Sequence, residues 1–155
     1  MSAEDYKEAL KLGQKAYRKA LGEGRYPYLP VLDDILSMQK IEREASLGIT
    51  EIPMSHIAGT RTAGRTKAFA NNFMPLLGEN SEFGSKWIAL CDSLIAEGLR
   101  DPVRVYEFLN RYYVLEGNKR VSVMKYLDSV SIEADVTRVM PPVERGEDGA
   151  PLIWP

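Results

Sequence analysis

The sequence has little of several residue types on which other small folds and metal sites depend. It holds one cysteine, Cys91, and one histidine, His56, so a disulfide framework is excluded and a cysteine–histidine zinc site lacks its ligands. No apolar run approaches the ~20 residues that a membrane-spanning helix needs, and the first five residues lack the positive charge of a secretory signal. The formal net charge of −2 gives no bulk attraction for polyanions. We therefore expect a cytoplasmic protein without a membrane partner.

The N-terminal third of the chain has helical spacing of its apolar residues. With 155 residues, 45% of them hydrophobic, the chain suits one core with appendages. A capping box of Ser2 and Asp5 begins a helix over residues 3–21, and a second helix runs from Leu32 to about Ala45. We expect these helices to form an N-terminal hairpin, residues 1–47, that covers one face of a sheet or forms a homodimer contact.

From residue 48 onward the pattern alternates between strands and helices, which predicts a mixed α/β (α+β) domain over residues 48–140. Cys91 falls in an apolar helical stripe, so we expect a packed thiol rather than a nucleophile. Residues 141–155 are rich in proline, glycine and charge and are expected to form a tail. The first predicted elements are a strand at 49–52, a turn near Ser55, a loop at 59–67 and a helix through Ala68, Phe69, Phe73 and Met74. A second helix is capped by Ser81, ends at Gly98 and has these residues on its buried side: Trp87, Ile88, Leu90, Cys91, Leu94 and Ile95. A hairpin of strands 102–106 and 112–115, a helix ending near Leu127 and a strand at 132–139 follow.

The junction between the second hairpin strand and the following helix has the features of a phosphate site. Gly117 permits a sharp turn, after which the amides of Asn118, Lys119 and Arg120 are the unpaired donors of a new helix. Cations are unfavourable at a helix N-terminus, so Lys119 and Arg120 there indicate a bound anion such as a di- or triphosphate. The alternative is a surface turn whose cations face water, or one in which Arg120 pairs with Glu116.

A second basic segment precedes this turn in the sequence. Residues 59–67 hold three cations, no acid, two glycines and three hydroxyls, a composition typical of a mobile loop that binds an anion. Arg61 and Arg65 are its candidates for closing over the phosphates. A merely solvated loop is the competing interpretation.

The order of these parts resembles the ParB and sulfiredoxin superfamily, which includes chromosome-partition proteins, sulfinic-acid reductases and small-molecule kinases. The resemblance covers residues 48–140. It rests on Ile52-Pro53-Met54-Ser55-His56-Ile57 as the opening strand and turn, on residues 97–105 as the passage from helix to strand, and on Glu116-Gly117-Asn118-Lys119-Arg120 as the nucleotide-phosphate box. Arg65 then falls where ParB-like proteins carry the arginine that closes their first box.

The chain also departs from this pattern. Sulfiredoxin-like reductases need a cysteine in the phosphate turn, where this chain has Asn118, so reductase activity is not expected. Some ten extra residues lie around positions 71–77. Only a short tail follows Val139, where ParB-like proteins carry a helix-turn-helix module, so DNA would be bound through another module.

The resemblance implies a domain that binds a nucleoside triphosphate, CTP or ATP, with or without Mg²⁺, as a switch or a slow hydrolase. Glu51 and Glu116 flank the two boxes, and Glu116 is the candidate catalytic carboxylate. The alternative for Glu116 is a salt bridge to Lys119 or to an arginine of the 61–65 loop. Rival functions are a DNA-binding, nuclease-like module, a phosphoryl-transfer enzyme, and an interaction domain that dimerises through its N-terminal helices.

Overall fold

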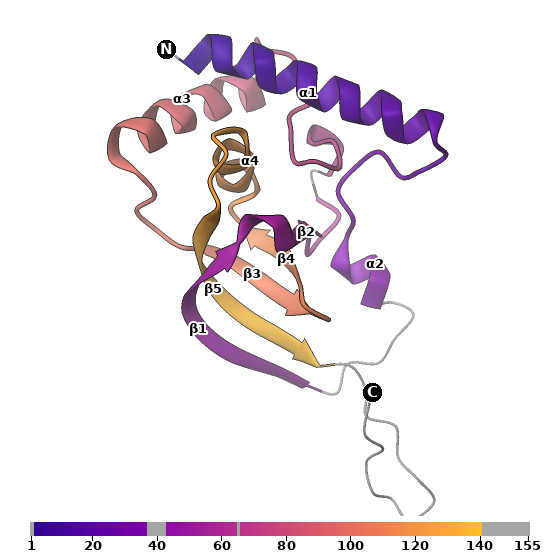
Figure 1. Cartoon of the computed structure of the whole chain (residues 1–155), viewed down its shortest axis with the longest axis vertical. Coiled ribbons are helices and arrows are strands. Elements are labelled where there is room, and N and C mark those ends of the chain that lie inside the picture. The colour runs from indigo at the N-terminus through magenta and orange to yellow at the C-terminus, as the bar shows by residue number, and fades with distance from the viewer. Residues whose placement is uncertain (1, 37–42, 65, 141–155) are drawn as a thin grey trace, which may run out of the picture.

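The computed structural model describes residues 2–36, 43–64 and 66–140. In these ranges a five-stranded mixed sheet in the order β1-β5-β3-β4-β2 carries helices on both faces (Figure 1), so the predicted mixed α/β fold is confirmed. The elements are α1 (Ser2–Gly22), α2 (Leu32–Leu36), β1 (Arg43–Pro53), the 3-10 turn η1 (Met54–His56), β2 (Ile57–Thr60), the 3-10 turn η2 (Thr66–Ala68), α3 (Glu82–Glu97), β3 (Val103–Phe108), β4 (Arg111–Glu116), α4 (Asn118–Tyr126) and β5 (Ser131–Met140).

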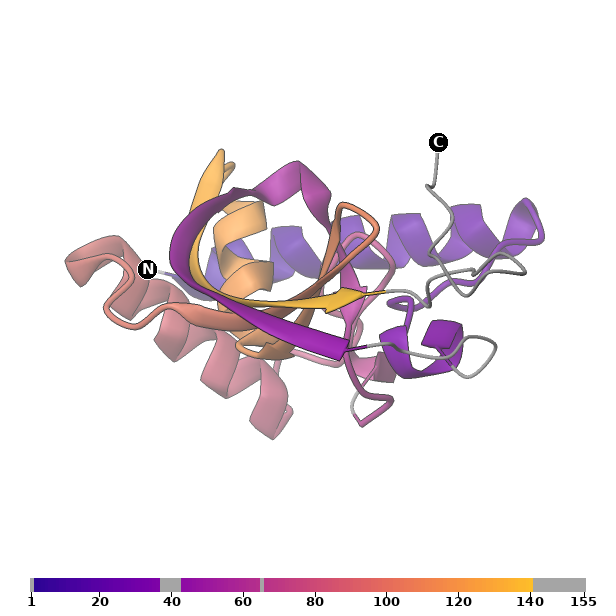
Figure 2. The same ribbon diagram turned by 90° about the horizontal axis from the view of Figure 1, so that it is seen from below.

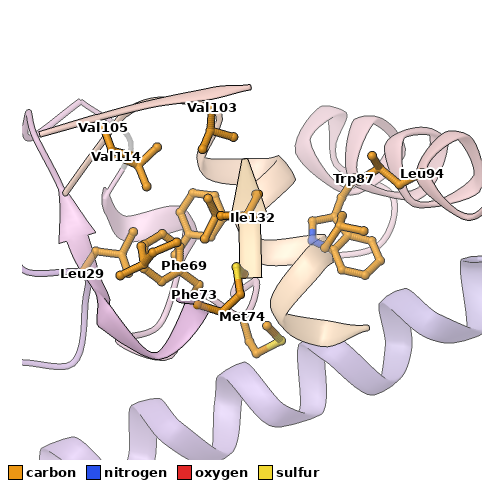
Figure 3. Packing of buried hydrophobic residues seen from close by; sticks show 14 of the residues in the cluster. Leu29, Phe69, Phe73, Met74, Trp87, Leu94, Val103, Val105, Val114 and Ile132 are labelled. Carbon is orange, nitrogen blue, oxygen red and sulfur yellow. The ribbon is translucent and has the colours of Figure 1, made fainter. Parts of the chain in front are cut away.

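The main core lies between the sheet and the helices α1, α3 and α4. The sheet is strongly curved, and α4 lies on its concave side (Figure 2). Alternate residues of the strands, such as Val103 and Val105 of β3, point into this core, where Figure 3 shows Phe69 and Phe73 between Leu29 and Ile132. The chain from Tyr6 to Val136 therefore contributes to a single core.

A smaller cluster occupies the opposite face of the sheet. Leu32 and Leu36 of α2 pack there against Phe108 of β3 and Tyr113 of β4. The neighbours of Tyr113 in sequence, Tyr112 and Val114, pack in the main core. Because α1 packs on α3 and α2 packs on the other face, the predicted N-terminal helical hairpin is wrong (Figure 1).

The second predicted helix is correct only in its first residues. Ala45 lies in β1, opposite Arg138 of β5, and residues 37–42 lie outside the described part of the chain. The apolar residues have helical spacing, but pairing of this segment with a strand from the other end of the chain determines its structure. The expected boundary between residues 47 and 48 lies inside β1, at the register shift between Ser46 and Gly48.

Two other local predictions differ from the structure, the loop at 59–67 only at its ends, where residues 59–60 lie in β2 and residues 66–67 in η2, and the helix after it in kind. The predicted loop at 59–67 begins with β2, which pairs in parallel with β4. The predicted helix through Ala68, Phe69, Phe73 and Met74 is instead η2 followed by an irregular turn, in which Phe73 has φ 68° and the Ala70 amide donates to the Met74 carbonyl. Burial of both phenylalanines fixes this turn, although their spacing is helical.

Most predicted elements of the remaining chain are confirmed. Ser81 caps α3 by accepting a hydrogen bond from the Gly84 amide at 3.0 Å, and Gly98 ends the helix with φ 74°. Of the predicted buried face of α3, Ile95 is an exception, because its side chain is 59% exposed. The β3–β4 hairpin turns at Leu109 and Asn110, both with positive φ. The Ser2 amide donates to Asp92 of α3 at 3.1 Å rather than completing a capping box with Asp5.

Candidate functional site

The turn between β4 and α4 has the geometry that the sequence predicted. Gly117 has φ 111° and ψ 26°, in the left-handed region. A Cβ on this residue would lie 2.7 Å from Cγ1 of Val103 and 3.0 Å from the guanidinium of Arg120. The position therefore requires glycine for both its backbone angles and its space.

The first turn of α4 presents backbone donors outward. The first helical hydrogen bond runs from the Val121 amide to the Gly117 carbonyl at 2.9 Å, so the amides of Asn118 and Arg120 precede the helical ladder. Gly117 offers no side chain to accept from them. The positive end of the helix dipole adds to these donors, and together they suit an anion.

A cleft of about 530 Å³ opens beside this turn, between the N-terminus of α4 and one side of α3. The lining includes three cations, two aromatic rings and no acidic residue. A cavity of this size is typical of small-molecule sites. The lining residues are Phe69, Phe83, Lys86, Leu90, Gly117, Asn118, Lys119 and Arg120.

The three cations are held by different partners. Nη1 of Arg120 donates to the Asp101 carbonyl at 2.8 Å, Nζ of Lys119 lies 5.5 Å from the centre of the Phe83 ring, and Nζ of Lys86 lies 2.7 Å from a carboxylate oxygen of Glu82. Arg120 thus bonds to a backbone oxygen and not to Glu116. Its charge stays uncompensated by that contact, which favours an anion in the cleft.

Asn118 joins α4 to the edge strand of the sheet. Its Nδ2 donates to Oγ1 of Thr60 at 3.2 Å, and that hydroxyl donates to the Val114 carbonyl at 3.0 Å. Oδ1 of Asn118 is buried, and no donor among the described residues reaches it. Asn118 also lines the cleft, so this oxygen is an unused acceptor of a residue at the site.

Of the other predicted site residues, the structure describes Arg61 and Glu116, and neither lines this cleft. The Arg61 guanidinium lies 2.8 Å from Asp33, 3.9 Å from Glu44 and 4.3 Å from the centre of the Tyr106 ring, on the face of the sheet that α2 covers. Arg65 lies outside the described residues. The predicted closure by Arg61 would therefore require its side chain to leave these partners.

Glu116 also lies outside the lining of the cleft. It ends β4 opposite Arg104 of β3, and its carboxylate is exposed and 3.6 Å from the Arg104 guanidinium. Arg104 is thus the described salt-bridge partner of Glu116. Glu51 is an exposed residue of the edge strand β1.

Sequence reasoning missed the residues that α3 contributes to the cleft. Phe83, Lys86 and Leu90 follow one another at intervals of three and four residues, so they share one side of the helix. The signal for this side of the helix that was available in the sequence was Lys86, a cation beside the apolar stripe. Its relevance depends on packing that brings α3 beside α4, which no local pattern shows.

The remaining candidate groups have structural surroundings. Cys91 is fully buried in the core, and burial raises the pKa of its thiol, so the expectation of a packed thiol is confirmed. His56 lies in η1.

Across residues 2–36, 43–64 and 66–140, no three His, Cys, Asp or Glu side chains lie together as a metal site would require. None of the described helices has the length and apolar character to cross a bilayer.

Comparison with known proteins gives one structural relative of note. No protein-family model and no curated protein matches the chain. The chain is similar to the crystal structure of sulfiredoxin from Arabidopsis thaliana, with 26% sequence identity and a TM-score of 0.40, over 57% of this chain and 82% of that one. The matched protein is a sulfiredoxin, and the ParB and sulfiredoxin superfamily is the one that the sequence resembles.

Proposed function

We propose that this chain is a cytoplasmic domain that binds a nucleoside triphosphate by its phosphates at the N-terminus of α4. The observation that carries this proposal is the acid-free cleft, in which Lys86, Lys119 and Arg120 surround the uncapped helix start. Anions at such a position gain from the helix dipole, from the backbone donors and from charge-assisted hydrogen bonds. CTP and ATP are the candidate nucleotides, with or without Mg²⁺.

The other walls of the cleft fit the rest of a nucleotide. Phe83 and Leu90 of α3 form an apolar side for a base or a ribose, opposite the charged turn of α4. Oδ1 of Asn118 accepts a hydrogen bond from a ribose hydroxyl or a base amine. In this arrangement a single ligand contacts both helices and stabilises their packing.

Glu116 limits the chemistry that follows binding. A hydrolytic or phosphoryl-transfer step would use this carboxylate to position water or Mg²⁺. Because Glu116 lies beside Arg104 and outside the cleft lining, it must move before it can act. We therefore propose that the chain acts as a nucleotide-dependent switch, with turnover slow or absent.

The test is a thermal-shift and calorimetry panel of ATP, CTP, GTP and their diphosphates, with and without Mg²⁺. A ligand at 100 times its dissociation constant stabilises the folded state by about 2.7 kcal/mol, which is visible as a rise in melting temperature. No shift and no heat from any nucleotide would overturn the proposal. So would tight binding of duplex DNA alone, with an affinity that falls steeply with salt.

A single substitution tests the site itself. Arg120→Ala removes a charge-assisted contact, so nucleotide affinity should fall by about 1.5 to 3 kcal/mol, or roughly 10- to 150-fold. The unliganded protein should melt near the wild-type temperature, because the described contact of Arg120 is one hydrogen bond at the surface. Calorimetry on the variant measures the first quantity and a melting curve the second.

Arg104→Ala is the matched control, since it removes an exposed arginine of β3 that does not line the cleft. It should leave nucleotide affinity unchanged. If Arg120→Ala instead destabilises the free protein and leaves affinity intact, Arg120 is a structural residue and the phosphate site is refuted.

A further inference from the structure

A second hollow lies beside α1, and no described residue of α4 lines it. We call it the tyrosine hollow. It has a volume of about 450 Å³ and is lined by Gln14, Tyr17 and Arg18 of α1, by Tyr28, by Lys67 and by the pair Leu76–Leu77. None of these residues lines the phosphate cleft. The tyrosine hollow is therefore a separate site, and it does not depend on the proposed nucleotide function.

The walls of the tyrosine hollow are fixed against one another by contacts outside it. Pro75 packs on α1 so closely that a Cβ on Gly13 would lie 2.1 Å from the Pro75 carbonyl oxygen. The Asn71 amide donates to the Pro27 carbonyl at 3.0 Å, and Tyr28 forms an isolated bridge with Ala70. A site with walls held in this way is preformed and pays little ordering entropy when a ligand binds.

Further contacts fix the wall of the hollow that Leu76 and Leu77 form. The Leu76 amide donates to the Ala68 carbonyl at 2.9 Å, and the Tyr6 hydroxyl, from the buried side of α1, donates to the Leu77 carbonyl. Leu77 nevertheless remains 40% exposed on the side of the hollow. An exposed leucine on a rigid backbone beside aromatic rings is a surface that an apolar ligand can cover.

The charged residues of the lining favour one sign of charge on the ligand. Among the residues that the structure describes, Arg18 and Lys67 are the only charged ones that line the tyrosine hollow, and both are positive. The Tyr28 hydroxyl raises the pKa of Tyr17, while the nearby charge of Lys67 acts in the opposite direction, so the two rings and the ammonium group share one small space. A guanidinium beside an ammonium matches a carboxylate.

The rings select the shape of the ligand. The Tyr17 and Tyr28 centroids lie 5.7 Å apart with the rings tilted at 55°, and both rings are half-buried. Such a tilted pair offers an apolar corner against which another ring can pack face-to-face with one tyrosine and edge-to-face with the other, and the volume excludes anything larger than a small molecule. We infer that the tyrosine hollow binds a small aromatic carboxylate, with its carboxylate on Arg18 and Lys67 and its ring against Tyr17, Tyr28 and Leu77.

The test uses three probes that share one ring and differ in charge: phenylacetate, the neutral 2-phenylethanol and the cationic phenethylamine. Chemical-shift titration of the ¹⁵N-labelled protein should give saturable binding of phenylacetate, with shifts at Tyr17, Tyr28 and Lys67. The two other probes should bind at least about tenfold more weakly, because they lack the charge-assisted contacts. Equal binding of all three probes, or no saturable binding of phenylacetate, would overturn the inference.

Variants then locate the binding. Arg18→Ala and Lys67→Ala should each weaken phenylacetate about tenfold, and Lys15→Ala, which removes an exposed cation of α1 outside the lining, should have no effect. Arg120→Ala should also leave phenylacetate binding intact. If Arg120→Ala abolishes it while Arg18→Ala does not, the probe occupies the phosphate cleft and the tyrosine hollow is not a site. Nucleotide binding in the Arg18→Ala protein reports separately on the proposed function.

Discussion

Gly117 is the residue on which the geometry of the α4 start depends most directly. Its positive φ turns the chain from β4 into α4, and its missing side chain leaves room for Val103 and for the Arg120 guanidinium. The same residue therefore sets the direction of the helix amides and the position of the arginine beside them. Any side chain here disturbs both the core and the cleft.

Gly117→Ala should lower the free energy of unfolding by about 2 to 4 kcal/mol, because it adds left-handed strain to an overpacked contact with Val103. Urea denaturation followed by tryptophan fluorescence measures this loss. Gly78→Ala is the control, since a Cβ at Gly78 meets nothing within 4 Å. An unchanged midpoint for Gly117→Ala would show that the turn adopts another conformation.

Two tyrosine hydroxyls make stability depend on alkaline pH. Burial, with a smaller contribution from Glu79, raises the pKa of Tyr6 to about 12, and burial together with hydrogen bonds to Glu8 and Asp5 raises the pKa of Tyr126. In the unfolded chain both tyrosines ionise near pH 10. Their contribution is thus fully present below about pH 10 and is lost as the pH rises toward the folded values.

We therefore expect the free energy of unfolding to fall between about pH 10 and pH 12. Denaturant midpoints measured at a series of pH values test this, and the double variant Tyr6→Phe, Tyr126→Phe should show a shallower decline. A decline of equal slope in the variant would assign the effect to other groups.

At the scale of elements, one buried polar contact joins α3 to α4. Nε1 of Trp87 donates to Oγ of Ser122 at 2.9 Å, and both residues are fully buried. The Trp87 ring also meets Tyr6 of α1, with centroids 5.2 Å apart. Trp87 thus holds the three helices together behind the phosphate cleft.

Ser122→Ala should destabilise the fold by about 1 to 3 kcal/mol, because it leaves a buried indole N–H without its acceptor. Trp87→Phe should cost more, since it removes packing as well. The double variant should cost less than the sum of the two single changes, because neither polar group then remains alone. Additive losses in chemical denaturation would mean that the hydrogen bond contributes nothing.

The elements that the sequence predicted well are those defined by local signals. Ser81 accepting from Gly84, the positive-φ pair in the β3–β4 turn and Gly117 before α4 are all set within a few residues. The failures involve distant partners. Ala45 pairs with Arg138, and Arg61 is drawn to Asp33 and Tyr106, across intervals that no periodicity reveals. For the same reason only half of the cleft was predicted, because α3 reaches the cleft only through packing.

At the scale of the whole molecule, the N-terminal helix belongs to the main core. Tyr6 and Ala9 of α1 are fully buried in the same cluster as Val105 and Val136 of the sheet. The helix also covers Trp87 and contributes three of the seven residues that line the tyrosine hollow. A division of the chain near residue 47 would cut through this core.

Removal of residues 1–31 should therefore expose Trp87 and leave a chain with a weak or absent unfolding transition. A red shift of tryptophan emission and loss of a cooperative melt are the expected results. A truncated protein that melts cooperatively near the wild-type temperature would show that residues 32–155 form an independent domain.

The strand order also determines when the protein can fold during its synthesis. β5, the last strand in the chain, lies between β1 and β3, and Arg43 pairs with Met140 at the far end of the sequence. Until residue 140 has left the ribosome, β1 has no strand to pair with, and the core lacks Ile132, Ala134 and Val136. Earlier strands and helices must then wait with apolar surface exposed, a state that favours aggregation and chaperone binding. The sheet is therefore completed only after β5 has been synthesised.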